Sequence, residues 1–350
     1  MAKFLYRTAF SKMSTALNPR ESGEHIVRHA KYLKVKPDGI DRLVEEIVNG
    51  VISKKISVEN FSQHDLHPKA TDEYAANWIF VVDTLNFCFW TPTNYTKYKV
   101  NGYTGYFAMC AAINRAMADG MDITNPRYYS QLDLETLAHI FRPDDAETKM
   151  PLLEERLAAL KQVGERLLEK WHGRFDNVVR AAEKSAIGLL DLIVEEFPCY
   201  RDVAEFAGQK VSILKRAQIL IGDLWSCYRG TDLGYFRDID KITMFADYRI
   251  PQVLVHFGSL EYTPELLEQL KADRIMQNGE EMEVEIRGAS IYIIEQVKDA
   301  VVAKLKQEHP TMDLSNVNAI LIDQYLWDYR RKYAAELEHI PFHKTRSIYY

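Results

Sequence analysis

The stretch KITMFADYRIPQVL, residues 241–254, contains the clearest candidate for a chemically active side chain. Asp247 lies among Phe245, Ile250 and Val253, which are residue types that proteins bury. A carboxylate is rarely buried without a partner, because the loss of its hydration is costly. Asp247 is therefore either an ordinary paired aspartate of the core or a charge held in a pocket to do chemistry.

A second segment, VSILKRAQILIGDLW at 211–225, supplies a cation that could approach Asp247. Its apolar residues recur at helical spacing, which predicts a helix with Lys215 near its start. A connector follows this helix, and Asp247 then stands at the start of the next one. The free N–H groups of a helix N-terminus favour an ionised carboxylate, which can stabilise a developing sugar cation or orient an attacking water. The alternative is that Asp247 only caps its helix and pairs with Lys215 or Arg249, and the residues alone favour it.

The segment LIDQYLWDYRRKY, residues 321–333, could provide a surface for a flat ligand. Asp323 and Trp327 are one helical turn apart, and Asp328 is next to them. An acid beside an indole ring suits a heterocycle that offers N–H donors and a stacking face. An amphipathic helix with its tryptophan in the core is the more common explanation.

Four isolated polar residues are weaker candidates. His64 in FSQHDLHP precedes a proline-bounded loop, and Arg287 in VEIRGAS could bind a phosphate or a carboxylate. A solvated turn histidine and a surface salt bridge are the ordinary alternatives. Asp83 and Asn86 interrupt the apolar run VVDTLNF, so they either line a cavity or satisfy backbone groups.

Motifs of several common enzyme classes are absent from the sequence. There is no GxSxG, HExxH or GxGxxG pattern, and GTDLG at 230–234 lacks the lysine and hydroxyl residue of a phosphate loop. The cysteines are widely spaced and include no CxxC pair, so they predict buried, reduced thiols and neither a zinc site nor a disulfide framework. We expect no metal and no cofactor.

Composition limits the class of protein further. The chain has 350 residues, 47% of them hydrophobic, which is ample for a large core. Its net charge is −6, whereas binding to duplex nucleic acid relies mainly on Lys and Arg at the phosphates. No secretory segment appears, and the most apolar run, 75–90, is too short and too interrupted to span a bilayer. We expect a soluble, cytoplasmic protein without nucleic-acid or membrane partners.

The fold class predicted from the sequence is mainly α with a small antiparallel β element. Asn101-Gly102 is a strong hairpin signal, and with the run 78–87 it predicts a small sheet near residues 78–108. The acidic loop 141–151 is the best candidate for an internal seam. Helical patterns cover 151–173, 177–198, 211–225, 263–279, 284–308 and 315–338.

Ten blocks of sequence, in order along the chain, resemble a known family. They are PRESG, AANWIFVVDTLNFCFW, GYFAMCAAINRA, MPLLEER, FPCYRD, LKRAQILIGDLW, ITMFADYRIPQVL, VEIRG, LIDQYLWDY and IPFHKTRSIYY. Together they resemble the queuosine salvage protein family. The resemblance implies cleavage of the N-glycosidic bond of queuosine 5′-phosphate, which releases the 7-deazaguanine base queuine, and a fold like that of helix-hairpin-helix DNA glycosylases. It also implies a variable extension at 1–18 and a single glycosylase-like domain at 19–350.

The resemblance changes the interpretation of the candidate residues and makes Asp247 the expected catalytic group. It implies a small-molecule substrate and a monomeric enzyme. The other classes that stay open are a DNA or RNA base-excision glycosylase, which would need a basic docking surface, and a non-catalytic binder of modified nucleotides. The expected substrate-binding residues are Phe245, Asp323 and Trp327 for the base, Lys215, Arg249 and Arg287 for the 5′-phosphate, and His64, Tyr248 and Asp328 elsewhere in the pocket.

Overall fold

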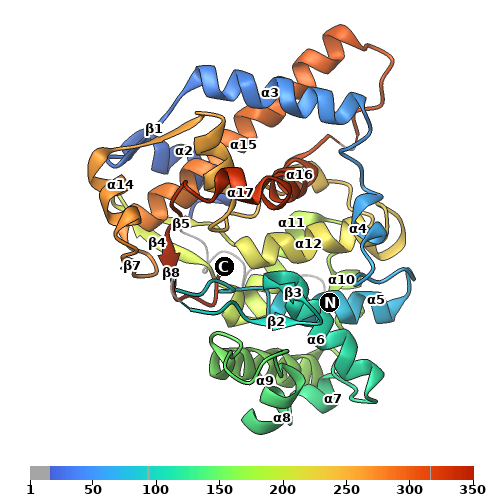
Figure 1. The fold of residues 1–350 in the computed structure, drawn as a ribbon. Helices are drawn as coiled ribbons and strands as arrows, with labels where there is room; N and C mark the ends of the chain where they lie inside the picture. Colours follow the sequence, from blue (N-terminus) through green and yellow to red (C-terminus); the bar gives the residue numbers. More distant parts are fainter. Residues whose placement is uncertain (1–15, 93–94, 316) are drawn as a thin grey trace.

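The protein was studied as a computed structural model, which describes residues 16–92, 95–315 and 317–350. It is mainly helical, with four two-stranded sheets among the described residues, so the predicted fold class is confirmed at this level (Figure 1). The helices are α2 Pro19–His29, α3 Pro37–Ile52, α4 Asn60–Gln63, α5 Glu73–Thr84, α6 Gly105–Ala118, α7 Pro126–Tyr129, α8 Leu134–Ile140, α9 Leu153–Lys170, α10 Phe175–Ala181, α11 Ala186–Glu196, α12 Lys215–Cys227, α13 Ile250–His256, α14 Pro264–Lys271, α15 Glu281–Glu308, α16 Ala319–Lys332 and α17 Ala334–Leu337.

The strands are short and pair mainly in antiparallel fashion. β2 and β3 form the hairpin predicted at Asn101-Gly102, where both turn residues have positive φ angles of 51° and 78°. The other pairs are β1 with β6, β4 with β5, and the parallel pair of β7 with β8. Their bounds are β1 Leu33–Val35, β2 Lys99–Val100, β3 Tyr103–Thr104, β4 Val203–Phe206, β5 Gln209–Ser212, β6 Leu260–Tyr262, β7 Ile275–Met276 and β8 Lys344–Thr345.

Two large apolar clusters form the core and meet at α16 and at residues 213–214, just before α12. One contains buried side chains of α5, α6 and α9–α12, and the other contains those of α3 and α13–α16. The first half of α16 contributes to both, with Leu321 in one cluster and Ile322 in the other. In Figure 1, α3 and α15 lie on one side of this junction and α9 lies on the other.

The prediction of a strand at 78–87 is wrong, because most of this run belongs to α5. Asp72 caps the helix by accepting a hydrogen bond from the N–H of Ala75 at 3.1 Å. Nearly every side chain from Trp78 to Thr84 is buried. A helix that is apolar all round lacks the 3.6-residue pattern that would distinguish it from a buried strand.

Two predicted helices are each divided into two. The pattern at 177–198 becomes α10 and α11, because Glu183 and Lys184 adopt left-handed backbone angles and Ser185 then caps α11 through the N–H of Gly188. The pattern at 315–338 becomes α16 and α17, which are separated at Tyr333. The helices predicted at 151–173, 211–225 and 284–308 are present as α9, α12 and α15 with adjusted ends. The helix predicted at 263–279 is only half right, because α14 ends at Lys271, Asp273 adopts a left-handed backbone angle, and Ile275–Met276 forms β7.

The predicted N-terminal extension is described only from residue 16, and residues 1–15 lie outside the described part of the chain. Leu17 donates a backbone hydrogen bond to Lys210 at 2.9 Å, and Asn18 caps α2. Apolar side chains on both sides of the predicted seam, such as Ile140 and Leu160, belong to the same buried cluster. The domain limits and the seam stay predictions.

Candidate active site

A cavity of about 920 Å³ lies at the junction of the two clusters. Its walls come from α4 and the loop after it, from the extended segment 86–92, from β3 and α6, from α12, from residues 245–249, from α16 and from the segment 342–350. It collects residues that are far apart in the sequence, including every predicted site residue except Arg287. The size and the mixed polar and aromatic lining suit a small organic ligand.

Asp247 lies in the wall of this cavity, three residues before α13. Its Oδ1 accepts hydrogen bonds from the backbone N–H groups of Arg249 at 2.7 Å and Ile250 at 2.9 Å. Within the described residues, no hydrogen bond or ion pair engages Oδ2. Asp247 is half-buried. The capping role considered from the sequence is therefore present, but it uses one carboxylate oxygen and leaves the other for a ligand.

Lys215 is the first residue of α12 and is almost fully buried in the cavity wall. The left-handed backbone of Leu214, with φ of 55°, precedes it. Its Nζ donates to the backbone oxygen of Asn86 at 3.1 Å and lies 3.4 Å from the Asn86 side-chain oxygen. Burial lowers the pKa of Lys215, and the negative charges of Asp247 and Asp83 oppose that effect.

A fully buried carboxyl group, Asp83, lies behind Lys215. The side-chain amide of Asn86 donates to its Oδ1 at 3.1 Å, while Oδ2 has no partner among the described residues. Burial raises the pKa of Asp83 to about 7, although Asn86, Lys215 and Arg216 each lower it. Of the two alternatives for this pair, Asn86 lines the cavity and Asp83 supports it from behind.

Aromatic and acidic side chains form one end of the cavity. Asp323 accepts a hydrogen bond from the backbone N–H of Phe245 at 3.1 Å. Burial, and then the nearby Asp247 charge, raise the pKa of Asp323 well above its usual range. Trp327 meets the ring of Phe107 edge-to-face at 5.5 Å, and His64 stacks on the same ring at 3.7 Å. These surfaces suit a flat heterocycle.

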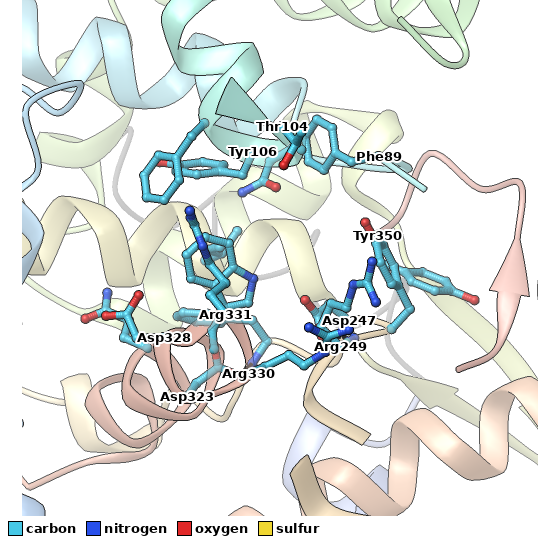
Figure 2. A pocket seen from close by; sticks show the side chains of 18 of the residues that line it. Phe89, Thr104, Tyr106, Asp247, Arg249, Asp323, Asp328, Arg330, Arg331 and Tyr350 are labelled. Atoms are coloured by element: carbon cyan, nitrogen blue, oxygen red, sulfur yellow. Dashed lines mark hydrogen bonds between the residues drawn. The ribbon is translucent and has the colours of Figure 1, made fainter. Parts of the chain in front are cut away.

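Arg331 and Asp328 complete this end of the cavity. The Arg331 guanidinium lies 4.2 Å from the ring centre of Phe107 and 4.8 Å from that of Trp327. Figure 2 shows Asp328 and Arg331 on the side of the pocket away from Tyr350, and Asp247 with Arg249 on the side nearer to it. Burial raises the pKa of Asp328, and the charge of Arg331 opposes this.

Cations gather at the other end, near Tyr248 and Phe342. Arg249 and Arg330 both donate to the side-chain oxygen of Gln252, at 3.1 and 2.8 Å. Arg330 also pairs with Glu338 at 2.8 Å, whereas Arg249 has no ion pair among the described residues. Burial and the nearby Arg249 charge lower the pKa of Arg330. Two convergent guanidinium groups on one neutral acceptor are well placed to receive an anion.

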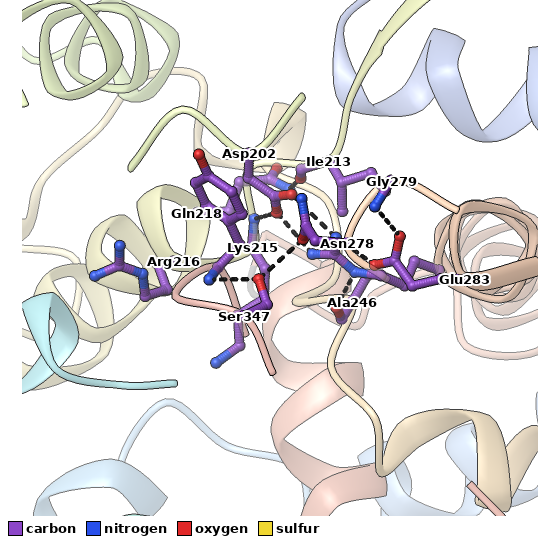
Figure 3. Close-up of polar contacts among 12 residues, drawn as sticks. Asp202, Ile213, Lys215, Arg216, Gln218, Ala246, Asn278, Gly279, Glu283 and Ser347 are labelled. Atoms are coloured by element: carbon purple, nitrogen blue, oxygen red, sulfur yellow. Dashed lines mark hydrogen bonds and ion pairs between the residues drawn. The ribbon is translucent and has the colours of Figure 1, made fainter. Parts of the chain in front are cut away.

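Arg287 is the predicted site residue that does not line the cavity, and its expected contact with a phosphate is not supported. It pairs with Asp202 at 2.6 and 3.0 Å and with Glu283 at 3.2 Å. Figure 3 shows these two carboxylates. Burial alone would lower the pKa of Arg287, but these two carboxylates raise it. Because Arg287 also donates to the backbone oxygen of Ala246 at 3.1 Å, it supports the chain next to Asp247 from behind.

Several polar residues of the cavity were not predicted from the sequence, among them Asp223 and Arg330. Asp223 is two steps of four residues along α12 from Lys215, and Arg330 is seven residues along α16 from Asp323. Both intervals place the residues on one helix face, so periodicity counted from the chosen residues could have found them.

No helix in the described ranges is both long and apolar enough to cross a membrane.

Comparison with known proteins identifies the family. The family model described as "Queuosine salvage protein" matches residues 66–350, which include all the predicted site residues except His64. The chain belongs to the queuosine salvage protein family. The family resemblance found in the sequence is thus confirmed over most of the chain.

Individual relatives match over nearly the whole length. A Bos taurus protein named "Queuosine 5′-phosphate N-glycosylase/hydrolase" is 43% identical over 97% of this chain and 100% of its own. Proteins of the same name from Schizosaccharomyces pombe and the bacterium Sphaerobacter thermophilus are each 34% identical, over 94% and 93% of this chain and 99% and 95% of theirs. Members of the queuosine salvage family with this name therefore occur in animals, fungi and bacteria.

Proposed function

We infer that this member of the queuosine salvage family is a queuosine 5′-phosphate N-glycosylase/hydrolase, an enzyme that releases queuine for salvage. The observation that carries this conclusion is the similarity, over nearly the full length of both chains, to relatives with that name. The cavity supports it, because one end offers aromatic and acidic groups, the middle offers a carboxylate, and the other end offers cations. This order matches a base, a sugar and a phosphate.

In the proposed mechanism, Asp247 acts at the sugar. As the bond between the base and C1′ lengthens, positive charge develops on the ribose, and the free Oδ2 of Asp247 either stabilises it or orients the water that attacks C1′. The water supplies the hydroxyl group to C1′ and a proton to the departing base. The N–H groups of Arg249 and Ile250 hold the carboxylate in place throughout.

Because of the chemistry of the leaving base, much of the stabilisation of the transition state has to occur at the ribose. A 7-deazaguanine lacks the N7 acceptor through which a purine base can be protonated. We propose that Phe245 and Trp327 provide its stacking surfaces, that Asp323 accepts hydrogen bonds from its N–H groups, and that His64 and Asp328 bound the pocket beyond it. With little help available at the base, stabilisation of the ribose charge by Asp247 becomes the dominant contribution.

The 5′-phosphate is proposed to bind among Lys215, Tyr248 and Arg249. Arg249 has the surroundings that best suit this role, because it donates to a neutral glutamine side chain, has no ion pair among the described residues and converges with Arg330. Lys215 stays a candidate, although it is deeper and lies near Asp247, Asp83 and Asp323. Arg287 is left out of the proposal because its carboxylate partners already occupy it.

Three further proposals concern the fold family, the domain limits and the oligomeric state. The order of Lys215 at the head of α12, a connector and Asp247 before α13 supports a relation to helix-hairpin-helix DNA glycosylases. The shared core on both sides of residues 141–151 supports a single domain over 19–350. A monomer is supported because all the groups that the mechanism uses come from one chain.

The decisive experiment is to incubate the purified protein with queuosine 5′-phosphate and to separate the products by chromatography. We expect queuine and ribose 5-phosphate in equal amounts. Tight binding of the nucleotide without release of base would indicate a non-catalytic binder. Release from an oligonucleotide with steep salt dependence, and none from the free nucleotide, would indicate a base-excision glycosylase.

A further inference from the structure

A second buried carboxyl group, Asp223, lies in the wall of the cavity and has no role in the mechanism above. It lies on the same face of α12 as Lys215 and Ile219, which also line the cavity. Only 5% of its surface is exposed. A carboxyl group in such a position is costly to maintain unless it has a purpose or a partner.

The partners of Asp223 within the protein are few. The Gln324 side chain hydrogen-bonds to it, and Gln324 also donates to Ser226 at 3.3 Å. No ion pair to Asp223 occurs among the described residues, and the one cation close enough to affect it, Lys215, is shared with Asp83, Asp247 and Asp323. A carboxyl group has two oxygens with about four acceptor positions, so most of this capacity is left for a ligand in the cavity.

The groups around Asp223 indicate what kind of ligand this is. Asp323 projects from α16 into the same cavity, and burial followed by the charge of Asp83 raises the pKa of Asp223 well above its usual range. Aromatic walls enclose the acids: Tyr106, Phe245 and Trp327 line the same cavity. A flat ring that brings several N–H donors would satisfy the acceptor positions of both carboxyl groups and would favour their ionised form once bound, whereas an anion would be repelled by them.

The packing of α12 keeps this part of the cavity in shape. A Cβ atom added at Gly222 would come within 2.6 Å of the Phe245 ring, so the absence of a side chain lets the ring lie directly on α12 beside Asp223. Phe245 is in turn fixed by the hydrogen bond from its backbone N–H to Asp323. One aromatic face and one of the two carboxyl groups are therefore fixed against each other, next to the helix that carries Asp223.

We propose that Asp223 is a specificity-determining residue that, together with Asp323, accepts hydrogen bonds from the adjacent ring N–H and exocyclic amino group of a guanine-type base. This inference rests on the proposed function for its placement of the base at this end of the cavity. It adds a residue and a rule of selection: bases with an amino-pyrimidinone edge bind, and analogues without the amino group are rejected. A site built to bond a donor rejects an analogue without it strongly, because its own polar groups are then left unpaired.

The test measures binding by calorimetry, with 7-deazaguanine and 7-deazahypoxanthine as the base probes. They differ only in the exocyclic amino group. The wild-type protein should prefer 7-deazaguanine by roughly tenfold to a hundredfold, the usual range for a hydrogen bond to a charged or strongly polar group. The variant Asp223→Asn should lose most of this preference, and its affinity for ribose 5-phosphate should stay unchanged.

Controls separate recognition from folding and from the proposed function. Asp191→Asn, in a different groove of the molecule, should keep the wild-type preference. Unchanged binding of ribose 5-phosphate shows that the cavity of Asp223→Asn is intact, and if that variant does not fold, the wild-type comparison of the two bases can still overturn the inference. A wild-type protein without preference, or an Asp223→Asn variant that keeps it, overturns the inference. Failure of the wild-type protein to release queuine overturns the proposed function instead.

Discussion

Arg287 and Arg249 both bond to the segment that carries Asp247, yet their surroundings differ in kind. Arg287 is held by two carboxylates and a backbone oxygen and is 1% exposed. Arg249 donates to the neutral Gln252 side chain, lies 4.4 Å from the ring centre of Phe342, borders the cavity and has no ion pair among the described residues. A cation whose partners are all supplied by the protein stabilises the fold. A cation with unused hydrogen-bond donors facing a cavity is available for a ligand.

The first test concerns Asp247, the carboxylate in the segment to which both arginines bond. Asp247→Asn keeps the shape of the side chain and removes its charge. Release of queuine should fall by about 10²–10⁴-fold, the range for loss of a catalytic acid–base group, while nucleotide affinity is largely retained. Single-turnover kinetics and equilibrium binding measure the two quantities separately. Near-normal turnover in this variant would remove Asp247 from the mechanism.

On the structural side, we expect Arg287→Met to destabilise the fold. It leaves Asp202 and Glu283 as unpaired buried carboxylates, so the free energy of unfolding should fall by roughly 3–5 kcal/mol. Arg287→Lys should restore little, because one ammonium group cannot reproduce the paired bonds to Asp202. Denaturant titration gives the values, and unchanged stability in both variants would contradict the structural role.

On the ligand side, Arg249→Met should slow cleavage of queuosine 5′-phosphate by roughly tenfold to a hundredfold, because one charge-assisted bond to phosphate is lost. Cleavage of queuosine, which lacks the phosphate, should be slow in the wild-type protein and change much less in the variant. Lys215→Met provides the matched comparison for the deeper cation. Equal losses on nucleotide and nucleoside in either variant would assign that residue to the base, the sugar or Asp247.

The smallest expected effect concerns His343, which is buried near Arg287 and has no hydrogen-bond partner among the described residues. Burial, and then the charge of Arg287, lower the pKa of His343 to about 3. The unfolded chain binds a proton below a pH of about 6.5 and the folded protein does not, so stability is complete above that pH and is lost on acidification.

The contribution of His343 should be about 1.4 kcal/mol per pH unit below that point. His343→Gln cannot titrate, so its free energy of unfolding should fall less steeply between about pH 6.5 and 5 than that of the wild-type protein. His29→Gln, at an exposed position, is the control. Parallel pH profiles for wild type and His343→Gln would show that this histidine is not held neutral.

The two arginines also show where sequence analysis succeeds and where it cannot. Local signals are reliable when the cause is local: the Asn101-Gly102 hairpin and Lys215 at the head of α12 are present as predicted. The partners of Arg287 depend on the fold, because Asp202 is 85 residues away in the chain. No periodicity reveals that such a pair meets.

The candidate site was predictable to a similar degree. Asp247 could be selected because a carboxylate among apolar residues is conspicuous, and the family resemblance then gave it a role. Asp223 was not selected, because in the sequence it is an ordinary polar residue within a helical pattern. The strand predicted at 78–87 is wrong because burial on all sides of α5 removes the helical period from its sequence. Surroundings created by tertiary packing are the part that one sequence does not contain.

The four cysteines, all buried and unpaired, give the molecule a built-in reporter of opening. Burial raises the pKa of Cys88, although Arg346 opposes this, so little reactive thiolate forms. The Cys88 N–H is bonded to the backbone oxygen of Tyr350 at 2.9 Å, beside the segment that lines the cavity. Because Cys88 is fully buried, a thiol reagent reaches it when this contact separates. The rate at which Cys88 is labelled therefore measures how often the wall of the cavity opens.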